Sequence, residues 1–157
     1  IAAIKFGDLI NHRSKDYIFD MDKFLSFEGK TGTYLLYNIT RIYSVLKKVD
    51  VADAPLAITS DAERELCLKL LLSPEAFDKA LAEQAPNLVC ENAYVIAQAF
   101  SKMYHDCPVA NEPDEQVKAS RVALCRLTKD ILLQHLDILG IEAVENNVFG
   151  TKNVAFY

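Results

Sequence analysis

Residues 34–48 carry two stripes that face opposite ways, and this pattern restricts the segment to one amphipathic helix. The apolar stripe recurs at four-, three- and four-residue steps and consists of Leu35, Ile39, Ile42 and Leu46. The polar stripe also recurs at helical steps and consists of Tyr34, Tyr37, Arg41, Ser44 and Lys48. At about 100° per residue, the two stripes lie on roughly opposite sides of a helix. We therefore expect the apolar stripe to be buried and Arg41 and Lys48 to be exposed.

Helix-start signals recur further along the chain. Ser60 and Glu63 fit a capping box, in which each side chain satisfies a free backbone amide at the start of a helix. Ser73 precedes Pro74, which predicts an N-cap followed by proline in the first turn of the next helix. Asn87 is expected to cap the helix after that.

The last long helix is expected to open at Pro113-Asp114 and to lie centrally, because its apolar residues cover a wide arc. Gly140 followed by Ile141 predicts a left-handed cap at its end. No stretch alternates for long enough to predict a sheet. The predicted fold class is therefore all-α, a helical bundle of about five to six helices.

Charge is distributed unevenly along the 157 residues, which are enough for one domain with a core. The first 50 residues hold 8 Lys or Arg and 6 Asp or Glu, a net of +2, and residues 51–157 hold 9 and 16, a net of −7. The overall charge of −5 argues against a general nucleic-acid coat. Any RNA contact should therefore be local and centred on the first third of the chain.

A search for reaction chemistry finds almost nothing. The histidines are isolated, and the four cysteines stand singly, without the clustered spacing that zinc needs. Gly29-Lys30-Thr31 looks like the end of a phosphate loop, but Leu25 stands where that loop requires glycine. We therefore expect no catalytic residue, no metal site and no cofactor in this chain. No run of about 18 apolar residues is present, so no membrane span or membrane partner is expected.

The polar stripe of residues 34–48 has two chemical interpretations. Aromatic rings stack on unpaired bases and cations meet phosphates, so the stripe suits single-stranded nucleotides. Alternatively, the tyrosines finish the edge of the core and the cations are merely solvated. Spacing alone leaves both interpretations open.

Several motifs follow one another in a fixed order and spacing. They are Ala3-Ile4-Lys5-Phe6, Phe27-Glu28-Gly29, Thr31-Gly32, Tyr34-Leu35, Tyr37, Arg41-Ile42, Phe100-Ser101-Lys102-Met103-Tyr104, Cys107-Pro108-Val109, Ala119-Ser120-Arg121-Val122-Ala123-Leu124 and Leu139-Gly140-Ile141. Together they closely resemble the arginyl-tRNA synthetase family, over most of residues 3–145. In that family the segment matching residues 27–42 joins the catalytic domain to the DALR-type anticodon-binding domain.

The resemblance implies a set of tRNA-binding residues. With Lys48 added from the polar stripe, they are Tyr34, Tyr37, Arg41, Lys48, Tyr104 and Arg121. Tyr34, Tyr37 and Arg41 stand at motif positions that face the anticodon loop, and Tyr104 stands at the tyrosine that closes the fourth helix. Arg121 matches an arginine that opens the last helix, although an internal ion pair with an acidic helix end explains it equally well.

The resemblance also implies a parent enzyme, an arginine–tRNA ligase in the cytoplasm. This chain would bind the anticodon arm of tRNA(Arg) as a monomer, while a preceding catalytic domain attaches arginine using ATP with Mg. The two signature motifs of that catalytic domain are not in this chain, which starts without Met. We therefore expect the chain to be a fragment that is inactive by itself.

The expected division is a junction at residues 1–30, a DALR-type domain at 31–147 and an extension of unknown role at 148–157. The Glu-Arg-Met ending that is common in the family is absent here. The alternative function is a non-catalytic helical protein-interaction module, which uses the acidic second half as its surface. That alternative requires an exposed apolar patch away from the polar stripe.

Overall fold

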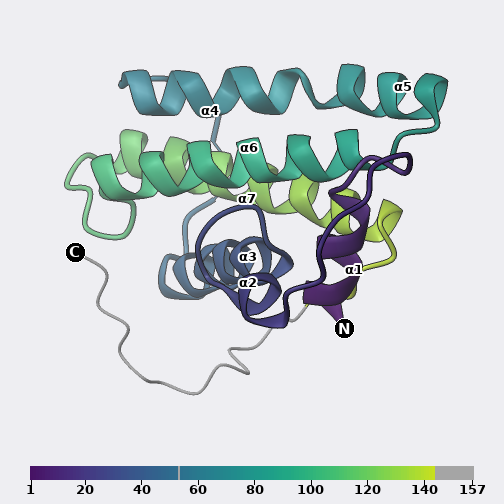
Figure 1. The fold of residues 1–157 in the computed structure, drawn as a ribbon. Coiled ribbons are helices and arrows are strands. Elements are labelled where there is room, and N and C mark those ends of the chain that lie inside the picture. Colours follow the sequence, from purple (N-terminus) through teal and green to yellow (C-terminus); the bar gives the residue numbers. More distant parts are fainter. Residues whose placement is uncertain (53, 144–157) are drawn as a thin grey trace.

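The computed structural model describes residues 1–52 and 54–143, and every regular element within these ranges is a helix. The helices are α1 (Ala2–Leu9), α2 (Met21–Leu25), α3 (Gly32–Lys48), α4 (Asp61–Leu71), α5 (Ser73–Glu83), α6 (Asn87–Asp106) and α7 (Glu115–Ile138). The all-α prediction is confirmed (Figure 1). The described residues form seven helices, not five to six, because α1 and α2 are only 8 and 5 residues long and carry little periodic signal.

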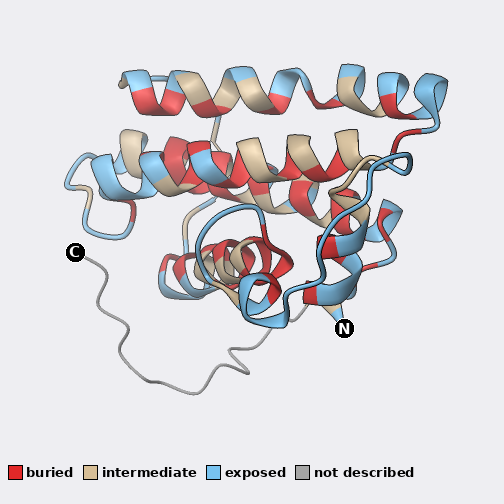
Figure 2. Cartoon of the chain, viewed as in Figure 1, coloured by how far each residue is buried: buried red, intermediate tan, exposed pale blue. Residues whose placement is uncertain are grey.

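The helices pack in layers (Figure 1). Helices α4 and α5 lie end to end and cover α6, while α6 and α7 run beside each other through the middle. Helix α3, with α1 and α2 against it, lies on the other side and contacts both α7 and α6. Buried residues concentrate where these layers meet (Figure 2). The central place expected for the last helix is confirmed.

Capping chemistry sets several helix ends. The Thr31 side chain accepts a hydrogen bond of 3.0 Å from the Tyr34 amide, so α3 begins at Gly32, ahead of the apolar stripe. The capping box of Ser60 and Glu63 is confirmed at the start of α4. At the end of α7, the chain turns through a left-handed glycine with φ of 64° at position 140, as predicted.

Two predicted N-caps are wrong by one residue. Ser73 and Asn87 are the first helical residues of α5 and α6, and neither helix has a side-chain cap. The N-cap position belongs to Leu72 before α5 and to Pro86 before α6. Both of these residues already have right-handed helical backbone angles, so the chain enters each helix without the extended residue that a Ser or Asn cap requires.

The apolar stripe of α3 points into the core as predicted, with differences at its margins. Leu35, Ile39 and Ile42 are at most 1% exposed. Leu46 is only half-buried, because Val45, three residues after Ile42, takes the inner position. Lys48 is exposed, but Arg41 is half-buried instead of fully exposed. The helix phase is therefore correct, and Arg41 must pack against something on the polar face.

The N-terminal helix is part of the bundle. The Phe6 side chain of α1 is fully buried in the core. Gly32 allows α1 to approach α3 closely, because a Cβ atom there would lie 2.7 Å from the Ala2 carbonyl oxygen. Helix α1 therefore packs onto the start of α3 through a contact that any side chain at position 32 would disrupt.

Two cations near the N-terminus tie it to the ends of other helices. The Lys5 ammonium donates a hydrogen bond to the Gly140 carbonyl oxygen, just past the end of α7. The Arg13 guanidinium donates to the carbonyl oxygens of Glu83 and Gln84, at the end of α5. The last carbonyl groups of a helix lack intrahelical partners, so both cations occupy favourable positions.

His135 gives the bundle a predicted pH response. Its ring is fully buried beside Phe77, with Nδ1 2.7 Å from the Ile131 carbonyl oxygen, and burial lowers the pKa of the imidazole below its ordinary value. As pH falls below about 6.5, the unfolded chain takes up a proton that the folded chain excludes, so stability is expected to fall. Urea unfolding between about pH 7.5 and 5.5 checks this. His135→Gln should flatten the dependence, and an unchanged slope in that variant would contradict the assignment.

Within residues 1–52 and 54–143, no helix combines the length and apolar character required to cross a bilayer.

Candidate nucleic-acid interface

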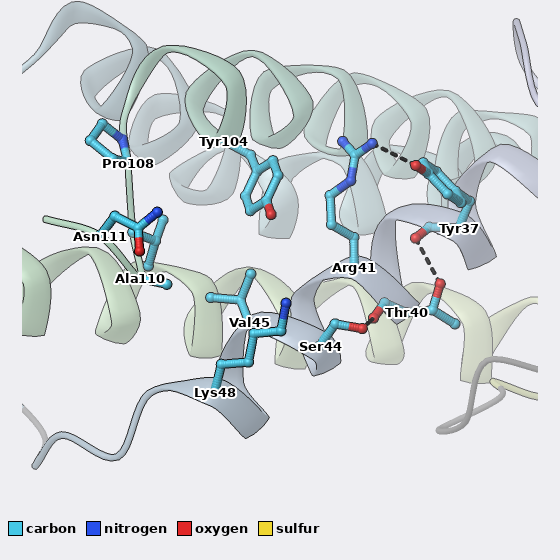
Figure 3. Close-up of a pocket in the computed structure, with 11 residues that line it drawn as sticks. Tyr37, Thr40, Arg41, Ser44, Val45, Lys48, Tyr104, Pro108, Ala110 and Asn111 are labelled. Carbon is cyan, nitrogen blue, oxygen red and sulfur yellow. Dashed lines mark hydrogen bonds between the residues drawn. The ribbon is translucent and has the colours of Figure 1, made fainter. Parts of the chain in front are cut away.

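An open pocket of about 490 Å³ lies between α3 and the loop that follows α6 (Figure 3). Helix α3 contributes Tyr37, Thr40, Arg41, Ser44, Val45 and Lys48, and the other wall consists of Tyr104 and residues 108–111. The polar stripe predicted from the sequence, apart from Tyr34, therefore faces a pocket, with Tyr104 opposite it.

Arg41 lies between two aromatic rings at this pocket. Its guanidinium carbon is 4.7 Å from the ring centroid of Tyr37 and 5.1 Å from that of Tyr104. One guanidinium nitrogen, Nη2, donates a 2.8 Å hydrogen bond to the Tyr37 hydroxyl, and Nη1 donates to Ser101 Oγ at 3.4 Å. These contacts explain why Arg41 is half-buried, and they join α3 to α6 at the pocket.

Tyr34 does not line this pocket and belongs to a second aromatic group beside it. Its half-buried ring lies 5.6 Å from the ring of Tyr94, and the Lys30 ammonium lies 5.8 Å from that second ring. Lys30 also forms an ion pair with Glu91. Burial raises the pKa of the Tyr34 hydroxyl, and hydrogen bonding to Ser101 and to Asn38 partly offsets that effect. Ser101 thus lies between Tyr34 and Arg41.

Arg121, which the sequence suggested as an RNA contact, does not line this pocket and is buried beneath it. Its side chain is 9% exposed, and Nε lies 2.6 Å from Oε1 of the buried Glu63. Its Nη1 donates to Glu112 and, at 2.8 Å, to the Pro108 carbonyl oxygen. Burial alone would raise the pKa of Glu63, but hydrogen bonds from Arg121 and Thr59 hold this pKa below its ordinary value. The internal ion pair, the other interpretation of the sequence, is the one that the structure shows.

Sequence reasoning missed several residues around the pocket. Tyr94 is half-exposed and lies off the apolar face of α6. The helical periodicity of the apolar residues around it could have identified it as a surface tyrosine. Lys30 gave no such signal, because its ring partner is 64 positions away. The wall at residues 108–111 has no periodicity at all, so only the folded chain brings it to α3.

The described part of the chain offers little reaction chemistry. No group of three or more His, Cys, Asp or Glu side chains within it is arranged to hold a metal ion. Burial raises the pKa of the Cys90 and Cys125 thiols to about 12, so neither forms a thiolate near neutral pH. The pocket itself presents rings, hydroxyls and cations.

The fold and the pocket together define a small all-α domain with an open pocket lined by aromatic and cationic side chains. The chain belongs to the DALR anticodon-binding domain family, whose family model matches residues 35–146.

The chain is also similar to curated proteins and to solved structures of one kind. An arginine–tRNA ligase from Maricaulis maris (strain MCS10) is 45% identical over 148 residues, which are 92% of this chain and 25% of the relative. One from Pasteurella multocida (strain Pm70) is 41% identical over 92% of this chain and 27% of its own length. The crystal structure of arginyl-tRNA synthetase from Plasmodium falciparum matches with a TM-score of 0.84 and 32% identity, over 92% of this chain and 26% of that one. The chain thus spans about a quarter of the length of these relatives.

Proposed function

We propose that this chain is the anticodon-binding part of an arginine–tRNA ligase, and that it binds the anticodon arm of tRNA(Arg) at the α3 pocket. The observation that carries the proposal is the position of Arg41 between the rings of Tyr37 and Tyr104, at an open pocket. An unpaired base stacks on an aromatic ring, and a guanidinium beside it meets the phosphate or the base edge.

The proposed binding residues are Tyr34, Tyr37, Arg41, Lys48 and Tyr104. Lys48, exposed at the end of α3, lines the pocket, and its ammonium is proposed to meet the RNA backbone. Tyr34, Tyr94 and Lys30 extend the same aromatic and cationic chemistry beside the pocket. Because the chain is acidic overall, binding depends on these few contacts more than on a broad field.

The proposal places the reaction outside this chain. In the parent enzyme, a preceding catalytic domain attaches arginine to tRNA(Arg) using ATP with Mg, in the cytoplasm. We propose residues 1–30 as the junction to that domain, residues 31–147 as the anticodon-binding domain, and a monomeric state. The extension proposed at residues 148–157 lies outside the described residues. The support for the parent is that relatives named arginine–tRNA ligase match 92% of this chain.

A second groove provides an apolar surface for the alternative function, a protein-interaction module. About 610 Å³ in volume, it lies between α5 and the ends of α6 and α7, and its lining includes Leu9, Phe77, Leu81 and Ile138. Leu81 and Ile138 are 80% and 60% exposed. If this groove alone carried the function, substitutions at the α3 pocket would leave tRNA affinity unchanged.

Tyr37→Ala in the full-length ligase is expected to weaken tRNA(Arg) binding by about 1–3 kcal/mol, the usual contribution of one base–aromatic stack. Tyr37→Phe should lose less, because the ring remains and only the hydroxyl that accepts from Arg41 is gone. Arg41→Ala should weaken binding and flatten the slope of log affinity against log salt by about 0.7, as expected for one lost phosphate contact.

The measurement is tRNA(Arg) affinity across a salt series, beside arginine activation in the absence of tRNA, which all three variants should retain. Tyr43→Ala is a matched control, since Tyr43 is a half-buried tyrosine of the same helix that does not line the pocket. If Tyr37→Ala bound tRNA as tightly as the Tyr43→Ala control does, with α3 still folded, the proposed site would be wrong.

A further inference from the structure

We propose that Arg121 is a positioning residue that holds the wall of the α3 pocket formed by residues 108–111. The inference rests on the proposed function, since it assigns that wall a part in binding RNA. It also gives Arg121 a role that its burial permits, in place of the direct RNA contact that the sequence suggested.

One guanidinium nitrogen of Arg121 reaches both ends of the wall. Nη1 donates to the Pro108 carbonyl oxygen at 2.8 Å and also to the Glu112 carboxylate. The four residues that line the pocket, 108–111, begin at the first of these acceptors and end just before the second. The guanidinium therefore fixes where this segment starts and where it ends.

The other side of the guanidinium is fixed by α4. Arg121 Nε lies 2.6 Å from Oε1 of Glu63, and Oε2 of Glu63 accepts from the Thr59 amide at 2.6 Å and the Ser60 amide at 3.1 Å. The Ser60 hydroxyl in turn lies 3.2 Å from Cys107 Sγ, directly before the wall. The capping box of α4 thus sets the position of Arg121, and Arg121 sets the position of the wall.

This arrangement predicts a different signature from that of a direct contact. Replacing an arginine that binds a phosphate lowers the affinity and flattens the salt slope. Replacing an arginine that positions the wall lowers the affinity and leaves the salt slope unchanged. That replacement also alters the wall in the absence of RNA, whereas replacing a residue with no part in the wall does not.

The test uses Glu112→Ala and Arg121→Lys in the full-length ligase. Glu112→Ala keeps the buried pair of Arg121 with Glu63, and Arg121→Lys keeps the charge but loses the fork that reaches several acceptors. Glu115→Ala is the matched control. Glu115 is an exposed carboxylate close in sequence to the wall, and it pairs with Lys118 of its own helix. Wild-type and variant proteins are compared in two measurements.

The first measurement is N-ethylmaleimide labelling of Cys107 without RNA, followed by peptide mass spectrometry. Cys107 is 2% exposed, so labelling requires the wall to open, and the fully buried Cys90 and Cys125 report global unfolding in the same sample. Both test variants should label Cys107 about tenfold faster or more, as expected for the loss of a charge-assisted hydrogen bond, and in every sample Cys90 and Cys125 should label much more slowly than Cys107. Wild-type labelling of Cys107 in both variants would overturn the inference.

The second measurement is tRNA(Arg) affinity across a salt series. Both variants should bind about three- to thirtyfold more weakly with the wild-type salt slope, in line with the loss of one positioning contact. Wild-type affinity in both would overturn the inference while leaving the proposed function intact. If the wild-type ligase itself failed to bind tRNA(Arg), the proposed function would fall, and Cys107 labelling would still decide whether Arg121 holds the wall.

Discussion

Replacing Glu63 with alanine is expected to lower the free energy of unfolding of this chain by about 3–5 kcal/mol, because it leaves a buried guanidinium without its partner. Glu63 is 1% exposed and accepts from Arg121, and its other oxygen accepts from the Thr59 and Ser60 amides. The change therefore removes an ion pair and half of the α4 capping box together. For a domain whose whole stability is about 5–15 kcal/mol, the loss is large.

Urea unfolding followed by circular dichroism measures this effect. Glu65→Ala is the control, because Glu65 lies on the same helix but pairs with Lys102 at the surface, where both side chains are about half exposed. The control should unfold close to the wild-type urea concentration, since exposed ion pairs contribute little. Equal midpoints for Glu63→Ala and the control would mean that the buried pair does not stabilise the fold.

Phe6→Ala is expected to have an effect of similar size, about 3–5 kcal/mol, because a fully buried phenylalanine leaves a cavity when it is truncated. Phe6 lies in the core, and α1 packs closely on α3 at Gly32. Loss of the ring should therefore destabilise the whole bundle in one transition, although α1 falls within the proposed junction at residues 1–30.

The measurement is urea unfolding followed by circular dichroism and, separately, by labelling of the core thiols Cys90 and Cys125. Ile4→Ala is the control, since Ile4 is on the same helix and 45% exposed. Coincident, shifted transitions are the expected result for Phe6→Ala. A transition of the core thiols at the wild-type position would show that α1 folds apart from the bundle.

The helices could be predicted because their signals are local. In α3, the apolar stripe fixed the helix phase, and at α4 the capping box marked the start to the residue. The errors at Ser73 and Asn87 arose where the preceding residue already had helical backbone angles, which composition does not reveal. Local chemistry thus predicted the elements better than their junctions.

The site could be predicted only in part, because its second half is assembled by tertiary packing. Tyr37 and Arg41 are four residues apart on one helix face, so their proximity followed from periodicity. The burial of Arg121 could not be predicted, because its partner Glu63 is 58 positions away and the pair forms only where α4 meets α7. The wall at 108–111 reaches α3 only through that same packing.

The placement of Arg41 between two rings has a consequence for conformational entropy. A free arginine side chain carries about 2 kcal/mol of rotamer entropy. Here the Tyr37 hydroxyl, Ser101 and two ring faces restrict the side chain before any RNA arrives. In the proposed complex, most of the ordering that accompanies binding therefore occurs in the RNA loop, which must adapt its bases to a fork whose direction is already set.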